Sequence, residues 1–66
     1  MPFRINGIET EVGGNLTIGR LLSERNIVPN IVVIQYNGKI LRKELFDTTQ
    51  IIDGDNIEIL RFVGGG

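Results

Sequence analysis

The sequence has no cysteine and no histidine among its 66 residues. No disulfide can therefore cross-link the chain. A zinc site of the usual Cys/His type is excluded, and so is any catalytic triad in which Cys or His acts as nucleophile or base. The groups that remain for chemistry are carboxylates, hydroxyls, lysine amines and the terminal carboxylate of the chain.

An excess of basic charge and long hydrophobic runs are lacking too. The formal net charge is −1, whereas nucleic-acid-binding domains are usually basic. The one basic doublet, Arg42 and Lys43, is better explained by a solvated face. The longest apolar run, residues 31–34, is far too short to span a membrane, and residues 1–4 begin a strand-like pattern rather than a signal peptide. We therefore expect a cytoplasmic protein with no nucleic acid and no membrane among its partners.

What the chain does contain is typical of one small globular domain. Hydrophobic residues make up 41% of the sequence and charged residues 23%, which is a globular rather than a disordered composition. A chain of this length buries only about 60% of the surface that it exposes when unfolded, so its core is small. We place the domain at residues 1–63 and a flexible C-terminal glycine tail at residues 64–66.

The first ten residues predict a β-hairpin. Asn6 and Gly7 lie between two alternating runs, and both residue types tolerate the positive φ angles of a two-residue type I′ turn. The predicted register pairs Phe3 with Thr10, Arg4 with Glu9 and Ile5 with Ile8.

A helix is expected next, with Thr17 as its N-cap and an end near Asn26. Gly19 in the first turn has two interpretations: a close approach of another backbone, or simple tolerance of glycine, which we favour. Three apolar residues recur at helical spacing and are expected to face the core: Ile18, Leu21 and Leu22.

The second half of the chain predicts mainly strands. The stretch 31–36 is apolar on both faces, as an inner strand is. Asp53 and Asp55 flank a glycine, and a tight turn explains them better than a metal site does. Tyr36 and Phe46 are expected in or beside the core rather than against a ligand. The other predicted elements are an Asn37-Gly38 turn, a short strand at 39–41, a helical turn at 43–46 and a last strand at 56–63.

This order of elements predicts an α+β fold of the β-grasp (ubiquitin-like) type. The fold has a mixed sheet of four to five strands, with one main helix packed on one face. No combination of base, nucleophile and pocket is present in the pattern, so we do not expect an enzyme.

The last strand leads into Gly64, Gly65 and Gly66. Taken alone, these glycines are best explained as a frayed end. However, a backbone without Cβ atoms can also enter a channel that is too narrow for other residues. It would then present the carboxylate of Gly66, which becomes an acyl donor only after activation, for example as an acyl adenylate.

Over its whole length the chain resembles the ThiS family of sulfur carriers of thiamine biosynthesis. The length, the Asn6-Gly7 hairpin and the stretch TIGRLL that begins at Thr17 all match. The most specific combination is DGD, an apolar strand and a terminal Gly-Gly. The third glycine here departs from the two-glycine ending of many members.

The resemblance implies a protein co-substrate that binds no cofactor of its own. A ubiquitin-activating-like (ThiF-like) adenylyltransferase would use ATP and magnesium to adenylate Gly66. A persulfide from a cysteine desulfurase system would then convert the adenylate to a thiocarboxylate. A ThiG-like thiazole synthase would take the sulfur into the thiazole ring of thiamine. Gly65 and Gly64 would be the flexible residues behind the reacting end.

The last strand also predicts a docking surface. Alternation puts Ile57 and Ile59 on one face, and Leu60 and Phe62 on the other. If the first pair packs under the helix, the second is left exposed beside the tail. The alternative is that Phe46 or Phe3 closes this face. The residues that we expect to seat the chain on its activating enzyme are Leu60, Arg61, Phe62 and Val63.

Other interpretations stay open. The small subunit of molybdopterin synthase shares the fold, the tail and the chemistry, but such chains are usually longer and often have prolines before the Gly-Gly. Phe62 and Val63 stand there in this chain, which favours ThiS. A tRNA-thiolation carrier also tends to be longer. A β-grasp interaction module without acyl chemistry is the alternative from a different class of function.

Overall fold

The computed structural model describes residues 2–11 and 14–61. Phe62, Val63 and the glycine tail lie outside the described residues, so the domain boundary at residue 63 stays a prediction. The elements follow the predicted order, with 3-10 turns at Pro29–Ile31 and Lys43–Leu45. The strands and the helix are β1 (Phe3–Ile5), β2 (Ile8–Thr10), α1 (Ile18–Glu24), β3 (Val32–Tyr36), β4 (Lys39–Leu41) and β5 (Asn56–Arg61).

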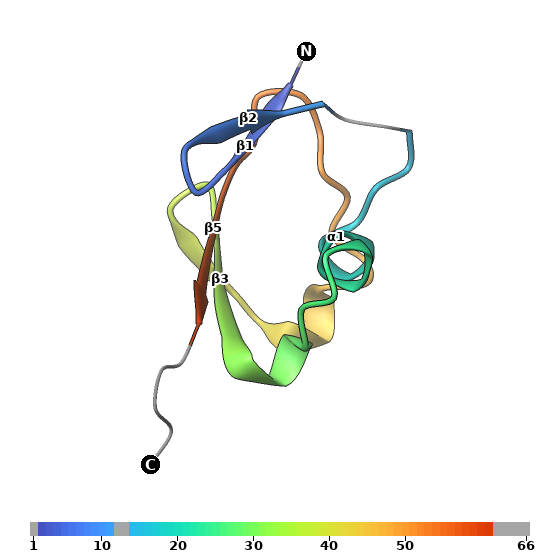
Figure 1. Ribbon diagram of the computed structural model, residues 1–66, viewed down its shortest axis with the longest axis vertical. Coiled ribbons are helices and arrows are strands. Elements are labelled where there is room, and N and C mark those ends of the chain that lie inside the picture. Colours follow the sequence, from blue (N-terminus) through green and yellow to red (C-terminus); the bar gives the residue numbers. More distant parts are fainter. Residues whose placement is uncertain (1, 12–13, 62–66) are drawn as a thin grey trace.

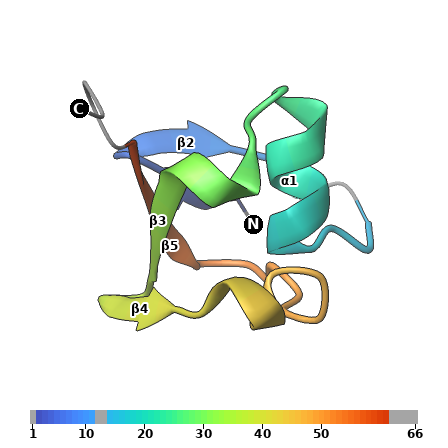
Figure 2. The ribbon, with the colours of Figure 1, turned by 90° about the horizontal axis from the view of Figure 1, so that it is seen from below.

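The strands form one mixed sheet in the order β2-β1-β5-β3-β4 (Figure 1). β5 runs parallel to β1 and antiparallel to β3, whereas the two hairpins are antiparallel. α1 lies on one side of this sheet (Figure 2). The predicted β-grasp architecture is confirmed, and the last strand of the chain is also the central strand of the sheet.

Both Asn-Gly turns have the backbone that the sequence predicts. Asn6 and Asn37 have φ angles of 49° and 52°, and the glycines that follow them are also in the left-handed region. The register of the first hairpin is the predicted one. Positive φ at both turn residues matches the twist of the flanking strands, which is why asparagine and glycine are needed there.

The start of α1 is capped as predicted, because the Thr17 hydroxyl accepts a hydrogen bond from the Arg20 N–H at 3.1 Å. Our favoured interpretation of Gly19 as mere tolerance is wrong. The Gly19 N–H donates to the Phe46 carbonyl at 2.9 Å, and a Cβ atom at Gly19 would lie only 1.9 Å from a carboxylate oxygen of Asp47. This loop therefore approaches the helix closely at Gly19, and a side chain there would force the Asp47 carboxylate to move.

The helix ends at Glu24, slightly before the predicted end near Asn26. Asn26 itself has a φ angle of 58° and so leaves the helical conformation. Its N–H donates to the Ser23 carbonyl at 3.1 Å, and the Ile27 N–H donates to the Leu22 carbonyl at 2.9 Å. This pair of bonds is a Schellman motif, in which asparagine takes the place usually held by glycine.

The core lies between α1 and the sheet, and the three predicted helix residues are buried in it. Phe3 and Phe46 belong to the same core, at 0% and 4% exposure, so neither closes the opposite face of the sheet. That alternative is therefore excluded. Tyr36 packs at the edge of the core, as predicted. The buried apolar side chains are Phe3, Ile5, Leu16, Ile18, Leu21, Leu22, Val32, Ile34, Phe46, Ile51, Ile57 and Ile59.

Candidate functional site

The candidate site is the end of β5, which leads toward the glycine tail. Ile57 and Ile59 are buried beneath α1, whereas Leu60 is 48% exposed on the opposite face and Arg61 is exposed as well. The predicted division of β5 into a buried and an open face is thus confirmed. Of the residues that the sequence proposes for docking, the structure describes Leu60 and Arg61, while Phe62 and Val63 lie outside the described residues.

Leu60 is part of an apolar strip on the open face of the sheet. It pairs with Val33 of β3, and the β3 residue Gln35 pairs with Ile40 of β4. Residues that are directly opposite in a sheet share a face, so all four side chains lie on the open side. Ile40 is 62% exposed. We call Leu60, Val33 and Ile40 the open-face strip; exposed apolar groups gathered at one place are typical of an interaction surface.

A cleft of about 530 Å³ lies beside the end of β5. Two arginines line this cleft, Arg25 at the end of α1 and Arg61. No acidic side chain lines it among the described residues. Arg20 and Arg42, by contrast, form ion pairs with glutamates. The full lining is Ile5, Asn6, Arg25, Ile27, Ile59, Leu60 and Arg61.

At its start, β5 is anchored by a buried carboxylate. Asp55 is 6% exposed and accepts hydrogen bonds from the Tyr36 hydroxyl at 2.6 Å, the Ile52 N–H at 2.9 Å and the Asn37 amide at 3.1 Å. The predicted tight turn at residues 53–55 is confirmed, with Gly54 at a φ angle of 86°. The sequence does not reveal that the Asp55 carboxylate links this turn to the second hairpin, because the donors Tyr36 and Asn37 lie far from Asp55 along the chain.

The Tyr36 hydroxyl is affected by the same arrangement. Burial, the hydrogen bond to Asp55 and the negative charge of Asp55 together raise the pKa of Tyr36 to about 12, and burial is the largest of these causes. All three disfavour the tyrosinate. The hydroxyl is therefore a hydrogen-bond donor at neutral pH and not a base.

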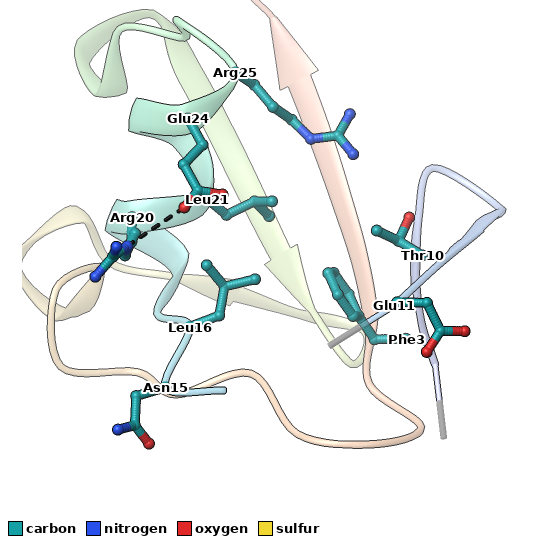
Figure 3. A pocket seen from close by; sticks show the side chains of 9 residues that line it. All are labelled: Phe3, Thr10, Glu11, Asn15, Leu16, Arg20, Leu21, Glu24 and Arg25. Carbon is teal, nitrogen blue, oxygen red and sulfur yellow. Dashed lines mark hydrogen bonds and ion pairs between the residues drawn. The ribbon is translucent and has the colours of Figure 1, made fainter. Parts of the chain in front are cut away.

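A second cleft, of about 600 Å³, lies between α1 and the first hairpin (Figure 3). Phe3, Leu16 and Leu21 line it together with charged residues. Two of these, Arg20 and Glu24, already form an ion pair at 3.4 Å. The cleft contains no β5 residue in its lining, and the described residues include no group of three or more potential metal ligands. The end of β5 therefore stays the candidate site.

Comparison with known proteins decides the family. The model of the ThiS family matches residues 3–66. The chain belongs to the ThiS family. This confirms the family predicted from the sequence, and the family is one of small sulfur carrier proteins rather than enzymes.

Individual relatives agree with this family. A sulfur carrier protein ThiS of Bacillus subtilis is 40% identical over 50 residues, which is 76% of each chain. A crystal structure of the thiamine biosynthesis protein ThiS of Geobacter metallireducens is 38% identical, covers 100% of both chains and has a TM-score of 0.81. A thiazole synthase of Paramagnetospirillum magneticum is 33% identical over 66 residues, and this chain spans only 20% of its length.

The ThiS match includes the glycine tail, although Gly64, Gly65 and Gly66 lie outside the described residues. Their role as the reacting end therefore stays a prediction. Among residues 2–11 and 14–61, no helix is long and apolar enough to cross a membrane.

Proposed function

We propose that this chain carries sulfur as a thiocarboxylate on Gly66 and delivers it for the thiazole ring of thiamine. The observation that carries the proposal is the match to the ThiS family, which extends through the last residue of the sequence. The sulfur carrier relative of Bacillus subtilis supports the same role. The chain acts here as the substrate of other enzymes and has no catalytic residue of its own.

The chemistry takes place on the carboxylate of Gly66. An oxygen of this carboxylate attacks the α-phosphorus of ATP, with magnesium bound at the activating enzyme, and pyrophosphate leaves. A persulfide from a cysteine desulfurase system then attacks the acyl carbon, and AMP leaves. The product is an acyl disulfide between Gly66 and the donor. A thiol then attacks the donor sulfur of this disulfide and forms a new disulfide with it. The sulfur on Gly66 leaves with the electron pair of the broken bond, as the thiocarboxylate.

The open-face strip is the surface on which we place the activating adenylyltransferase. Leu60 is exposed and belongs to the same strand that leads to the tail. An enzyme that docks on Leu60 therefore has the reacting end within reach, since the six residues that follow Leu60 span at most about 22 Å when extended. Arg61, the next residue, lies opposite Val32 on the other face of β5 and adds positive charge at the adjoining cleft. Phe62 and Val63 complete the proposed surface.

We place a thiazole synthase as the second partner. The relative in Paramagnetospirillum magneticum is itself named a thiazole synthase, and a fifth of its length matches this chain. A carrier-like segment inside such an enzyme supports the idea that the two work on the same product. A thiazole synthase that binds the carrier would take the sulfur from Gly66.

The test is a mass measurement on the tail. The chain is incubated with a ThiF-like adenylyltransferase that is active on another carrier, together with ATP, magnesium and a sulfur donor, and is then treated with a thiol alkylator. Because the chain has no cysteine, an alkyl adduct reports a new sulfur nucleophile. We expect the adduct on the last peptide. Absence of an adduct would contradict the proposal and favour an interaction module.

A further inference from the structure

β5 continues beyond the end of its neighbour β1. The parallel ladder pairs Ile5, the last residue of β1, with Ile57 of β5. On its other side β5 stays paired with β3 as far as Arg61, which lies opposite Val32. Within residues 2–11 and 14–61, the backbone of Ile59 therefore has no strand partner on the β1 side.

The side chain of Asn6 supplies that missing partner. The Ile59 N–H donates to Asn6 Oδ1 at 2.7 Å, and Asn6 Nδ2 donates to the Ile59 carbonyl at 3.3 Å. The Asn6 backbone N–H in turn donates to the Ile57 carbonyl at 2.8 Å. A side-chain amide has one acceptor and a donor group, as a peptide unit has. Asn6 thus extends the ladder by one step, up to the last residues before the tail.

The other Asn-Gly turn holds β5 in a similar way, but at its start. Asn37 Oδ1 accepts a hydrogen bond from the Asn56 N–H at 2.8 Å, and the Asn37 N–H donates to the Asn56 carbonyl at 2.8 Å. The two asparagines have nearly the same φ angle and each binds a β5 amide through its side chain. They differ in which end of β5 they hold: Asn37 binds Asn56 at the start of the strand, and Asn6 binds Ile59 nearer the tail.

We propose that Asn6 is a positioning residue for the reacting carboxylate, an inference that rests on the proposed carrier function. Its amide holds β5 at Ile59, close to the last described residues of the strand. Without this amide, residues 59–61 are held on the β3 side alone. The end of the strand then opens more often, and the carboxylate at Gly66 is presented over a wider volume. The adenylyltransferase would meet it less often in a reactive orientation.

The experiment compares Asn6→Gly with Asn37→Gly. Glycine keeps the positive φ angle at each turn, so each variant removes mainly the side-chain amide. Amide hydrogen exchange followed by NMR reads the strand directly. We expect exchange at Ile59 to accelerate by about tenfold or more in Asn6→Gly, and exchange at Asn56 to accelerate in Asn37→Gly.

The second readout is adenylation, measured as ATP–pyrophosphate exchange with the ThiF-like enzyme at varied carrier concentration. We expect kcat/KM for the carrier to fall by roughly tenfold in Asn6→Gly and by less than about twofold in Asn37→Gly, even at equal loss of thermal stability. Asn6→Asp keeps the acceptor and loses the donor, so its kcat/KM should lie between Asn6→Gly and wild type. If Asn6→Gly does not fold, Asn6→Asp takes its place in the comparison with Asn37→Gly.

The outcomes separate this inference from the proposed function. If the wild-type chain supports no ATP–pyrophosphate exchange, the carrier function fails, whatever the amide hydrogen exchange shows. If the wild type is active and the two glycine variants lose kcat/KM equally, Asn6 stabilises the fold without positioning the tail. An unchanged rate of amide hydrogen exchange at Ile59 in Asn6→Gly would also overturn the inference. Selective loss in Asn6→Gly, with intermediate activity in Asn6→Asp, would support it.

Discussion

The Tyr36 hydroxyl donates a hydrogen bond of 2.6 Å to the carboxylate of Asp55. This contact joins the end of β3 to the start of β5, which is the strand that leads to the glycine tail. Asp55 is buried but has three hydrogen-bond donors, so its burial does not leave a charge without partners. The pair therefore sets the position of the central strand, and it makes the stability of the domain depend on pH.

The first prediction concerns the titration of Tyr36. Its pKa is raised from the ordinary value of 10.0 to about 12 in the folded state. Below pH 10 both states hold the proton, and the stabilisation is complete. As pH rises from 10 to 12 the unfolded chain loses the proton first, so the free energy of unfolding should fall over this range. Above pH 12 this contribution should be lost.

The measurement is direct because the chain has one tyrosine and no tryptophan. Tyrosinate absorbance should report the Tyr36 pKa, with circular dichroism at each pH to show that the domain stays folded. Asp55→Asn should lower this pKa, but the value should stay above normal because burial is the largest cause of the shift. A normal pKa in the folded wild type would contradict the prediction.

The second prediction tests the open-face strip. Leu60→Asp should leave the domain folded, because Leu60 is exposed and does not belong to the core. It should raise the KM of the adenylyltransferase for the carrier by at least about tenfold, as expected when a central apolar contact is lost. Ile52→Asp is the matched control, because Ile52 is 60% exposed and lies outside the strip. Equal effects of the two variants would remove Leu60 from the docking surface.

The third prediction tests the charge beside the tail. Arg61→Glu should lower the rate of association with the adenylyltransferase, and the difference from wild type should shrink at high salt, because exposed charges act through long-range attraction that ions screen. Arg42→Glu carries the same change in charge in the segment that joins β4 to the second 3-10 turn. If both variants are slowed alike, net charge alone explains the effect and the cleft has no special role.

Local patterns in the sequence were enough to predict much of this fold. The Asn-Gly turns, the register of the first hairpin and the Thr17 cap each depend on residues close together in the chain. The faces of β5 were also predictable, because alternation is a local property. Alternation along the strand therefore predicts the exposed position of Leu60 from the sequence alone.

Apart from the exact end of α1, the errors and omissions involve contacts between distant segments. Gly19 was misjudged because the loop that approaches it, at Phe46 and Asp47, comes much later in the chain. The hydrogen bonds from Asn6 to Ile59 join residues 53 positions apart. No spacing rule finds such a pair, although an asparagine with positive φ beside a central strand is the signal that could have suggested it.

The last prediction concerns the length of the tail. Adding one alanine after Gly66 moves the carboxylate by roughly 3.5 Å and places a Cβ atom at the reacting end. A carrier should then lose adenylation entirely, with an unchanged melting temperature, because the folded domain is untouched. Deletion of Gly64 is the complementary variant, since it shortens the tail but keeps the two last glycines. If the third glycine is only a spacer, this variant should retain most of the activity. Full activity of the alanine extension would contradict acyl chemistry at Gly66 and leave the chain as an interaction module.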